Sequence, residues 1–335
     1  MISLWLEKKR KMAQNTVLGV EYDFSSLAAV KLDKKAESYS LVACSSEIFP
    51  PEAYFEDLLT VDYIGSTLAN IIADNKFSRF TKLGFISYKD INVSKEEIVC
   101  DKKALEIIAK EGTSFYLREH FFKKKYPSDY ANIAFDYYDK SQDKGVIIVY
   151  YINEINGLEK LYGIASKAKR ALSVCTLDKQ ALTNFVQKLY LSELSKSVKD
   201  SMFLGLYADK LCVYSFTPKG ELKNYESVKI FDIKIDNTSY IDEAIQLLLR
   251  FMDFMSLDYS EDSGFDSFSD QENIVHIYGL KDSFEEIVGS IQEFSMKNCQ
   301  ILDPFINIDC EKIGQEIKQP YRYVMPIAIA LREAL

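Results

Sequence analysis

Cysteine and histidine are the residue types in this 335-residue chain with the strongest intrinsic chemistry. They are Cys44, Cys100, Cys175, Cys212, Cys299, Cys310, His120 and His276. A structural zinc site needs closely spaced thiolate or imidazole ligands, and no two of these cysteines form a CxxC pair. Most of the cysteines stand among apolar neighbours, which is typical of small buried hydrophobic side chains. We therefore predict no metal site, and we expect His276 to be a packed histidine within a strand.

The motifs of common enzymes do not occur in this sequence. It contains no GxSxG, no P-loop, no HExxH and no recognisable context for a catalytic cysteine. Asp and Glu together number 50, but no pair has a spacing that specifies acid–base work. The residue patterns alone therefore identify no catalytic group.

Composition excludes two further classes of protein. With 47% hydrophobic residues the chain can bury a core, so we expect a globular protein of about two domains. A net charge of -9 and a pI near 5.1 argue against a nucleic-acid partner, because phosphate backbones are bound by clustered Lys and Arg. No apolar run approaches the roughly 18 residues that a membrane-spanning helix needs.

The chain begins with an apolar stretch followed by a basic one. The residues concerned are Leu4, Trp5, Lys8, Lys9, Arg10 and Lys11. This order is the reverse of a secretory signal, so we expect a cytoplasmic protein. The leader is predicted to lie at the inner-membrane surface, where each basic residue adds about 1 kcal/mol of attraction to anionic lipid. The alternative is a terminus without a role.

Hydrophobic periodicity predicts mixed α/β structure that opens with a hairpin. Strands over 16–22 and 27–32 are joined by a turn at Ser25 and Ser26. Up to residue 180 we further expect strands over 40–44, 83–86, 132–138, 145–152 and 172–177, and helices over 63–74, 102–125 and 154–169. The part from 88 to 175 is therefore predicted to form a compact α/β insert.

The second half repeats the opening pattern. Strands over 201–207, 210–217 and 226–233 follow in meander order, which suggests an internal duplication. The remaining elements expected are helices over 242–256, 283–296 and 323–335, strands over 273–278 and 300–302, and a surface loop over 258–271.

Five short strings resemble, in the right order, the PilM family of type IV pilus assembly proteins. They are residues 18–30, Tyr126-Pro127 with Phe135-Asp136-Tyr137, residues 171–182, Asp303-Pro304-Phe305, and residues 328–332. The resemblance implies an α/β, actin-like (ribonuclease H-like duplicated) fold with two lobes and an inserted α/β subdomain of the FtsA/PilM type. It further implies a leader over 1–14, a first lobe over 15–87 completed by 176–200 and 320–335, an insert over 88–175, and a second lobe over 201–319 with helical and loop structure over 234–272.

The resemblance also implies where a nucleotide would bind. In this fold two hairpin turns hold the phosphates with backbone N–H groups, and glycine is favoured there because the main chain approaches the oxygens closely. The corresponding positions here are Glu21, Asp23, Ser25, Ser26, Gly205, Tyr207, Gly279 and Lys281.

Several of these positions depart from the family pattern. Asp23 and Tyr207 stand where glycines are usual, and Gly205 replaces a metal-associated Asp. A carboxylate 4 Å from a phosphate repels it by about 4 kcal/mol at an effective dielectric of about 20. An Asp in a turn commonly caps its own backbone, which is the simpler interpretation of Asp23. Glu21 survives as a candidate ligand of Mg²⁺-bound water, and Lys281 as a phosphate contact. We therefore expect no cofactor, unless the altered turns retain affinity for ATP and Mg²⁺.

The implied partner is the cytoplasmic N-terminal peptide of a PilN-like inner-membrane protein. An extended peptide suits backbone pairing beside apolar pockets. The candidate groove residues are Phe85, Ile86, Tyr116, Phe135, Tyr137 and Tyr150. A pilus-assembly ATPase and further copies of this chain are additional candidate partners.

Three functions remain open at this point. The first is a pilus-assembly scaffold with an inactive or weakened ATP site. The second is a working ATPase that polymerises, as the actin relatives FtsA and MreB do. The third is the cytoplasmic module of a type II secretion inner-membrane platform.

Overall fold

The computed structural model divides the chain into two compact units. The main unit comprises Met1–Ile86 and Gly163–Leu335, and the insert unit comprises Ser87–Tyr162. The residues described are 17–35, 38–50, 61–86, 93–127, 130, 133–141, 145–152, 156–196, 200–230, 236–259, 274–311, 313 and 316–331. The predicted leader lies outside them, as does the predicted loop beyond residue 259.

The first sheet of the main unit has six strands in the order β14-β3-β2-β1-β4-β8. Their bounds are β1 (Val17–Tyr22), β2 (Ser26–Lys35), β3 (Ser38–Ile48), β4 (Lys82–Ile86), β8 (Leu172–Thr176) and β14 (Ile308–Asp309). β1 to β3 form an antiparallel meander, and β4 and β8 continue the sheet in parallel beyond β1. The predicted opening hairpin is therefore confirmed.

The second sheet repeats this topology with five strands in the order β11-β10-β9-β12-β13. Their bounds are β9 (Ser201–Leu206), β10 (Lys210–Phe216), β11 (Leu222–Lys229), β12 (Val275–Gly279) and β13 (Cys299–Ile301). Again an antiparallel meander is extended by two parallel strands beyond its first strand. This shared order confirms the internal duplication that the sequence predicts.

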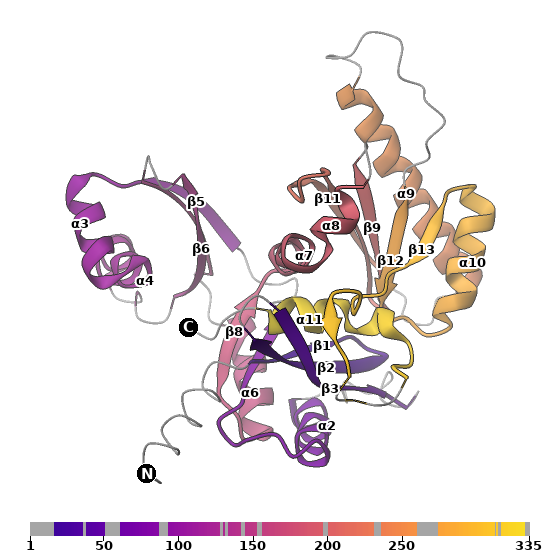
Figure 1. The fold of residues 1–335 in the computed structure, drawn as a ribbon, viewed down its shortest axis with the longest axis horizontal. Coiled ribbons are helices and arrows are strands. Elements are labelled where there is room, and N and C mark those ends of the chain that lie inside the picture. Colours follow the sequence, from indigo (N-terminus) through magenta and orange to yellow (C-terminus); the bar gives the residue numbers. More distant parts are fainter. Residues whose placement is uncertain are drawn as a thin grey trace. The chain divides into compact units, whose positions relative to one another are not determined.

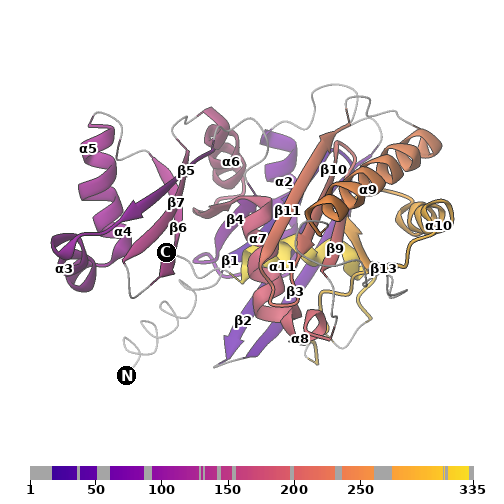
Figure 2. The same cartoon turned by 90° about the horizontal axis from the view of Figure 1, so that it is seen from above.

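The helices of the main unit pack against these sheets (Figures 1 and 2). Their bounds are α2 (Val61–Asp74), α7 (Asp178–Phe185), α8 (Leu191–Leu194), α9 (Asn237–Tyr259), α10 (Phe284–Ser295) and α11 (Val324–Ala330). α6 (Asn156–Lys167) begins in the insert unit and ends in the main unit. α11 packs on β1 and β2 and against α7, while α9 and α10 pack together and contact β10 and β13. The closing helix is thus the element that covers the strands of the opening hairpin.

The insert unit is a three-stranded sheet, β5-β7-β6, with helices on one face (Figures 1 and 2). Its elements are β5 (Val93–Val99), α3 (Lys102–Glu111), α4 (Thr113–Tyr116), a π-helical turn (Leu117–Phe122), α5 (Lys123–Lys125), β6 (Ala134–Ser141) and β7 (Val146–Ile152). Its core gathers around Leu117, Phe122, Ile147 and Val149. These core residues all belong to the insert unit, so the unit has a hydrophobic core of its own.

Several elements differ from the sequence predictions, and three of these differences concern the insert unit. The predicted helix over 102–125 is interrupted at Gly112, whose φ of 93° ends α3. β5 was not predicted, because three of the seven residues in its sequence VSKEEIV are charged, as befits a strand at the edge of a sheet. The predicted insert over 88–175 included β8, but β8 pairs with β4 in the first sheet.

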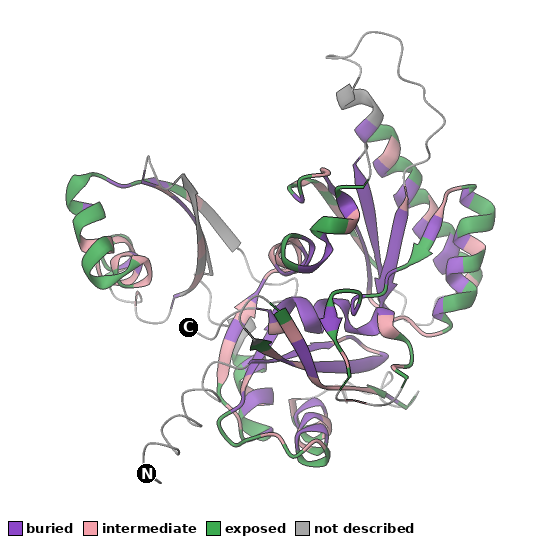
Figure 3. Ribbon diagram, in the orientation of Figure 1, coloured by how far each residue is buried: buried purple, intermediate pink, exposed green. Residues whose placement is uncertain are grey.

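Burial is concentrated in the strands of the two large sheets (Figure 3). β9 and β10 are buried along their whole length. The thiols of Cys100, Cys212 and Cys299 are buried as expected, while the other three cysteines are only half-buried. His276 is buried as predicted, against the rings of Tyr190 and Phe203. Within the described part of the chain, no helix has the length and apolar character needed to cross a bilayer.

Candidate functional site

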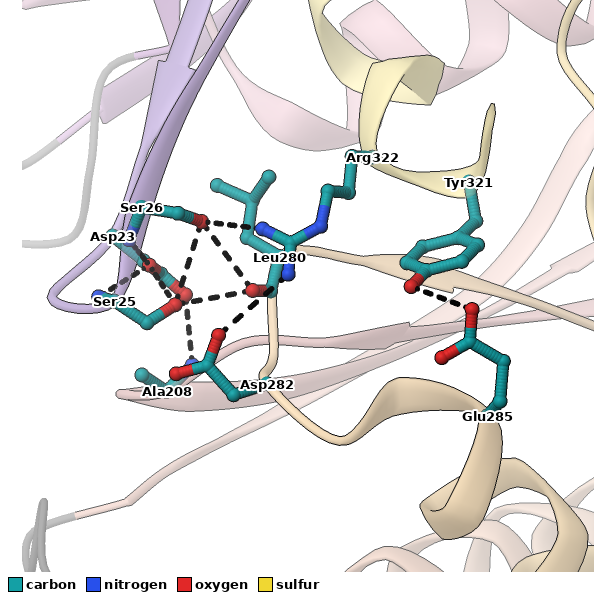
Figure 4. A network of polar contacts seen from close by, with 9 residues as sticks. All are labelled: Asp23, Ser25, Ser26, Ala208, Leu280, Asp282, Glu285, Tyr321 and Arg322. Atoms are coloured by element: carbon teal, nitrogen blue, oxygen red, sulfur yellow. Dashed lines mark hydrogen bonds and ion pairs between the residues drawn. The ribbon is translucent and has the colours of Figure 1, made fainter. Parts of the chain in front are cut away.

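Three chain segments from the two sheets meet at one place in the main unit, which we call the junction (Figure 4). They are the β1–β2 turn at Asp23, the β9–β10 turn at Ala208, and the end of β12 at Gly279. Leu280 and Lys281 both donate their backbone N–H to the carbonyl oxygen of Leu206, at 3.0 and 3.1 Å. The junction thus contains the two hairpin turns in which the family resemblance places phosphate binding.

The Asp23 carboxylate is the acceptor on which both turns converge (Figure 4). Its Oδ1 accepts the backbone N–H groups of Ser25 at 2.7 Å and Ser26 at 3.0 Å. Its Oδ2 accepts the backbone N–H of Ala208, 185 residues further along the chain, at 2.9 Å. The interpretation of Asp23 as a cap of its own turn is confirmed. The contact with the second turn was not predicted.

This carboxylate is 6% exposed, so its environment is that of the protein interior. Burial raises the pKa of Asp23 above its ordinary value, because a buried anion loses its hydration. The hydrogen bonds from Ala208 and Ser25 oppose that rise by stabilising the charged form. The carboxylate is thus placed where backbone N–H groups rather than water contact it.

The hydroxyl groups of the first turn connect it to β12 and to the segment before α11. Ser25 Oγ lies 2.7 Å from Asp23 Oδ1 and 3.0 Å from the carbonyl oxygen of Leu280. Ser26 Oγ accepts a hydrogen bond of 3.0 Å from Nη1 of Arg322. Arg322 is almost fully buried, and its Nη2 lies 3.6 Å from the carboxylate of Asp282. The first turn is therefore linked by polar contacts both to the residue after β12 and to the segment before α11.

Gly279 is required at the end of β12. Its φ is 141°, a conformation that side chains rarely tolerate. A Cβ here would lie 2.0 Å from the carbonyl oxygen of Leu206. This glycine therefore brings β12 against β9, and the space it leaves is taken by backbone.

Aromatic rings fill the part of the junction behind the second turn. Tyr207 and Tyr278 are buried and pack edge to face at 6.3 Å. A Cβ at Gly205 would lie 3.0 Å from the Tyr207 ring and 3.2 Å from the Tyr278 ring. Gly205 and Tyr207 both depart from the family pattern, and the two departures are complementary. The absence of a side chain at Gly205 leaves room for the ring of Tyr207.

A buried lysine lies among carboxylates in the same region. Lys210, at the start of β10, is 2% exposed, and its Nζ lies 3.9 Å from Asp178 Oδ2. Burial lowers the pKa of Lys210, but the neighbouring charges, Asp178 and Glu21 among them, raise it, and the net shift is upward. Lys210 therefore places a buried positive charge beside Asp178 and, at 4.6 Å from the ring centre, over Tyr207 of the second turn.

Lys281, the predicted phosphate contact, lies against an aromatic ring. Its Nζ lies 4.9 Å from the centre of the Tyr240 ring. The Tyr240 hydroxyl donates to the carbonyl oxygen of Tyr207 at 2.9 Å. Lys281 therefore stands next to the second turn, and its cation faces a ring.

The junction brings together most of the residues that the resemblance identifies, and adds several that sequence reasoning missed. Those missed are Ala208, Leu280, Arg322, Lys210 and Asp178. Ala208 and Leu280 act through backbone groups, so their residue type carries no signal. Lys210 directly follows Asp209 after a buried strand. A charged residue at that position is the sequence feature that could have identified Lys210 as part of the site.

The residues as they lie do not fit a nucleoside triphosphate. Three of the backbone N–H groups that phosphate oxygens would use, those of Ser25, Ser26 and Ala208, already donate to the Asp23 carboxylate. A phosphate at that place would meet a like charge at close range. Within the described residues, no cluster of three or more acidic, histidine or cysteine side chains is suited to hold a metal ion.

The predicted peptide-groove residues fall into two groups. Phe85 and Ile86 lie in β4 and are 0% and 1% exposed. This is a correction to their assignment, because side chains buried in the core of the main unit are not available to a peptide. Tyr150 lies in β7, but its side chain is outside the described part of the structure.

The other three residues are half-buried within the insert unit. Tyr116, Phe135 and Tyr137 pack against its core, and the hydroxyl groups of Ser114 and Tyr137 lie 3.3 Å apart. Phe135 and Tyr137 are two residues apart on β6, so they share one face of the strand. β6 is an edge strand of its sheet. Phe135 and Tyr137 are therefore on an edge strand, while Tyr116 belongs to α4.

Comparison with known proteins agrees with the architecture. No family model and no curated protein matches the sequence. A chain of a solved PilM–PilN type IV pilus biogenesis complex is similar over 95% of this chain and 98% of that chain, with a TM-score of 0.64 and 11% identity. A Bacteroides thetaiotaomicron protein of actin-like ATPase fold and unknown function matches over 96% of this chain and 98% of that chain, with a TM-score of 0.47 and 11% identity.

The cytoplasmic domain of EpsL, an inner-membrane component of the Vibrio cholerae type II secretion system, matches over 93% of this chain and 92% of that chain. Its TM-score is 0.34 and its identity 9%. The two duplicated sheets, the inserted unit and the match to the PilM–PilN complex all agree with the resemblance seen in the sequence. The chain has the actin-like fold, and its likeness to PilM is confirmed at the level of that fold.

Proposed function

We propose that this protein is a scaffold of type IV pilus assembly that binds the cytoplasmic N-terminal peptide of a PilN-like inner-membrane protein without hydrolysing ATP. The observation that carries this proposal is the shared fold, over 95% of this chain, with a chain of a PilM–PilN complex. A fold alone does not assign a function, so the proposal also draws on the two regions described above.

The junction supports the absence of ATP hydrolysis. Asp23 already accepts the amides of both hairpin turns. A nucleotide would have to displace a buried carboxylate that has four donors in hydrogen-bonding range. Displacing it leaves a buried charge without partners, which costs several kcal/mol.

The insert unit supports peptide binding. β6 is the last strand of its sheet, and an edge strand can accept an extended segment as an additional strand. Phe135 and Tyr137 add half-buried rings on this strand, and Tyr116 of α4 packs against the same core. Aromatic side chains of this kind dominate the energetics of many interfaces.

Cellular placement follows from the same proposal. A scaffold for an inner-membrane partner would work in the cytoplasm at the inner face of that membrane. Contacts with a pilus-assembly ATPase and with further copies of the chain belong to the proposal too. The basic leader, outside the described residues, is the segment proposed to touch lipid.

Isothermal titration calorimetry tests the proposal. The full chain is titrated with a synthetic peptide copied from the cytoplasmic N-terminus of the PilN-like protein of the same organism. A scrambled peptide of the same composition is the control. Saturable binding of the native peptide alone is expected. Equal heats from both peptides, or none from either, would exclude the scaffold role as stated.

A further inference from the structure

The donors around Asp23 have the arrangement of an anion site. The backbone N–H groups of Ser25 and Ser26 come from one turn and that of Ala208 from another, and all three point at a single carboxylate. The Ser25 hydroxyl lies 2.7 Å from the same carboxylate. Convergent backbone amides in turns are a common way in which proteins hold anions.

We propose that the Asp23 carboxylate is a built-in anion that occupies this site permanently, and that the site accepts a phosphate-class anion once the carboxylate is removed. Asp23 thereby ties the first sheet to the second without any ligand. This inference deepens the proposed inactivity toward ATP and rests on it, but it is independent of peptide binding.

The link between the turns depends on residues far apart in the sequence. Asp23 and Ala208 lie 185 positions apart, and Ser25 and Leu280 lie 255 apart. In each case a group of the β1–β2 turn contacts the second sheet or its following loop. Removal of the carboxylate would therefore loosen the contact between the sheets as well as free the amides.

The groups around the Asp23 carboxylate favour an anion at this position over an empty cavity. Without Asp23, three buried N–H groups would lose the acceptor that they share, and the loss of a buried acceptor is costly. Arg322, almost fully buried, contacts the same turn through Ser26 and adds positive charge. Asp282, its 3.6 Å ion-pair partner, is 43% exposed, so solvent screens that negative charge.

The first test compares two substitutions of Asp23. Asp23→Gly removes the side chain and restores the small residue that phosphate-binding turns favour. Asp23→Asn keeps the size and an oxygen acceptor, so it leaves the site filled and is the matched control. The thermal unfolding midpoints of both variants and of the natural protein are measured with and without sodium tripolyphosphate, at ionic strength balanced with sodium chloride.

We expect Asp23→Gly to unfold at a lower temperature than the natural protein and to regain several degrees with tripolyphosphate. The natural protein and Asp23→Asn should not respond. A folded Asp23→Gly variant that ignores tripolyphosphate would overturn the proposal, and so would an equal response in all three proteins. Failure of peptide binding, by contrast, would leave this result untouched.

A second measurement covers the case in which Asp23→Gly does not fold. Hydrogen exchange in the natural protein should show slow exchange for the amides of Ser25, Ser26 and Ala208, at the level of the adjoining strands. The Asp23→Asn variant, with a weaker acceptor, should exchange faster at Ala208. Rapid exchange of Ala208 in the natural protein would contradict a permanent link between the turns.

Discussion

The junction of the main unit and the aromatic edge of the insert unit use their side chains in opposite ways. In the junction Asp23, Lys210 and Arg322 are charged, buried and held by polar contacts. In the insert unit Tyr116, Phe135 and Tyr137 remain half-buried, and the last two lie on the edge strand β6. Buried charges that are satisfied internally resist displacement, whereas half-buried rings can still gain contacts. The difference fits the proposal that the junction serves the structure of the main unit and that the insert unit binds the partner peptide.

The largest effect is expected from Lys210→Met in the junction. The change keeps a long side chain but removes the positive charge that lies 3.9 Å from the Asp178 carboxylate. Loss of one partner of a buried charge cluster costs about 3–5 kcal/mol of unfolding free energy. Chemical denaturation measures this loss. Lys229→Met is the matched control, since Lys229 pairs with Lys210 across the strands and is exposed. Equal stability of the two variants would show that the junction is not a charge-dependent structure.

Acid should weaken the main unit through His276. Burial lowers the pKa of His276 from 6.5 to about 4, so the folded state resists protonation that the unfolded chain accepts. The unfolding free energy should therefore fall between about pH 6.5 and 4, by about 3 kcal/mol in all from this group. Denaturation midpoints across that range measure the loss.

His276→Gln should flatten this part of the pH profile. His120→Gln is the control, because His120 is exposed in the insert unit, where it stacks on Tyr116 at 5.8 Å. If both variants keep the full pH dependence, acid sensitivity does not arise from the buried histidine of the main unit.

A smaller effect is expected in the insert unit from Tyr116→Ala. Loss of a half-buried ring at an interface should weaken peptide affinity by about 1–2 kcal/mol, roughly 5- to 30-fold. Calorimetry with the PilN-like peptide measures it, and circular dichroism checks that the unit stays folded. Phe254→Ala removes an aromatic ring that is 55% exposed on α9 of the main unit, and should leave the affinity unchanged. The reverse pattern would move the peptide site to the main unit.

The smallest effect is expected from Tyr137→Phe. This change removes only the hydroxyl that lies 3.3 Å from Ser114 Oγ. A single hydrogen bond of this kind is worth about 1 kcal/mol, and a half-buried one less. The unfolding midpoint should fall slightly, with peptide affinity nearly unchanged. A large loss of affinity would instead assign the hydroxyl a direct contact with the peptide.

The sequence predicted the architecture better than the site. The hairpin of β1 and β2 and the repeated meander of β9 and β10 were evident, because apolar strands and short polar turns are local patterns. The charged edge strand β5 escaped, since its burial pattern is set by its neighbours. The cap of Asp23 on its own turn is likewise local, and was anticipated.

The contacts that define the junction could not be predicted in the same way. The bond between Asp23 and Ala208 joins a side chain to a backbone amide 185 residues away, and any residue type but proline supplies that amide. The burial of Phe85 and Ile86 also depends on the whole sheet, which is why both were misplaced in the groove. Residue type indicated which side chains were candidates, while the packing of the sheets decided which of them were accessible.

Calorimetry on the natural protein tests the central claim most directly. The chain is titrated first with ATP and Mg²⁺ and then, in the same cell, with the PilN-like peptide. The account predicts no heat of ATP binding and saturable peptide binding of the same affinity with or without ATP. Micromolar ATP binding would show that the Asp23 carboxylate readily leaves the amides of the two turns. It would contradict the claim that Asp23 occupies this site permanently.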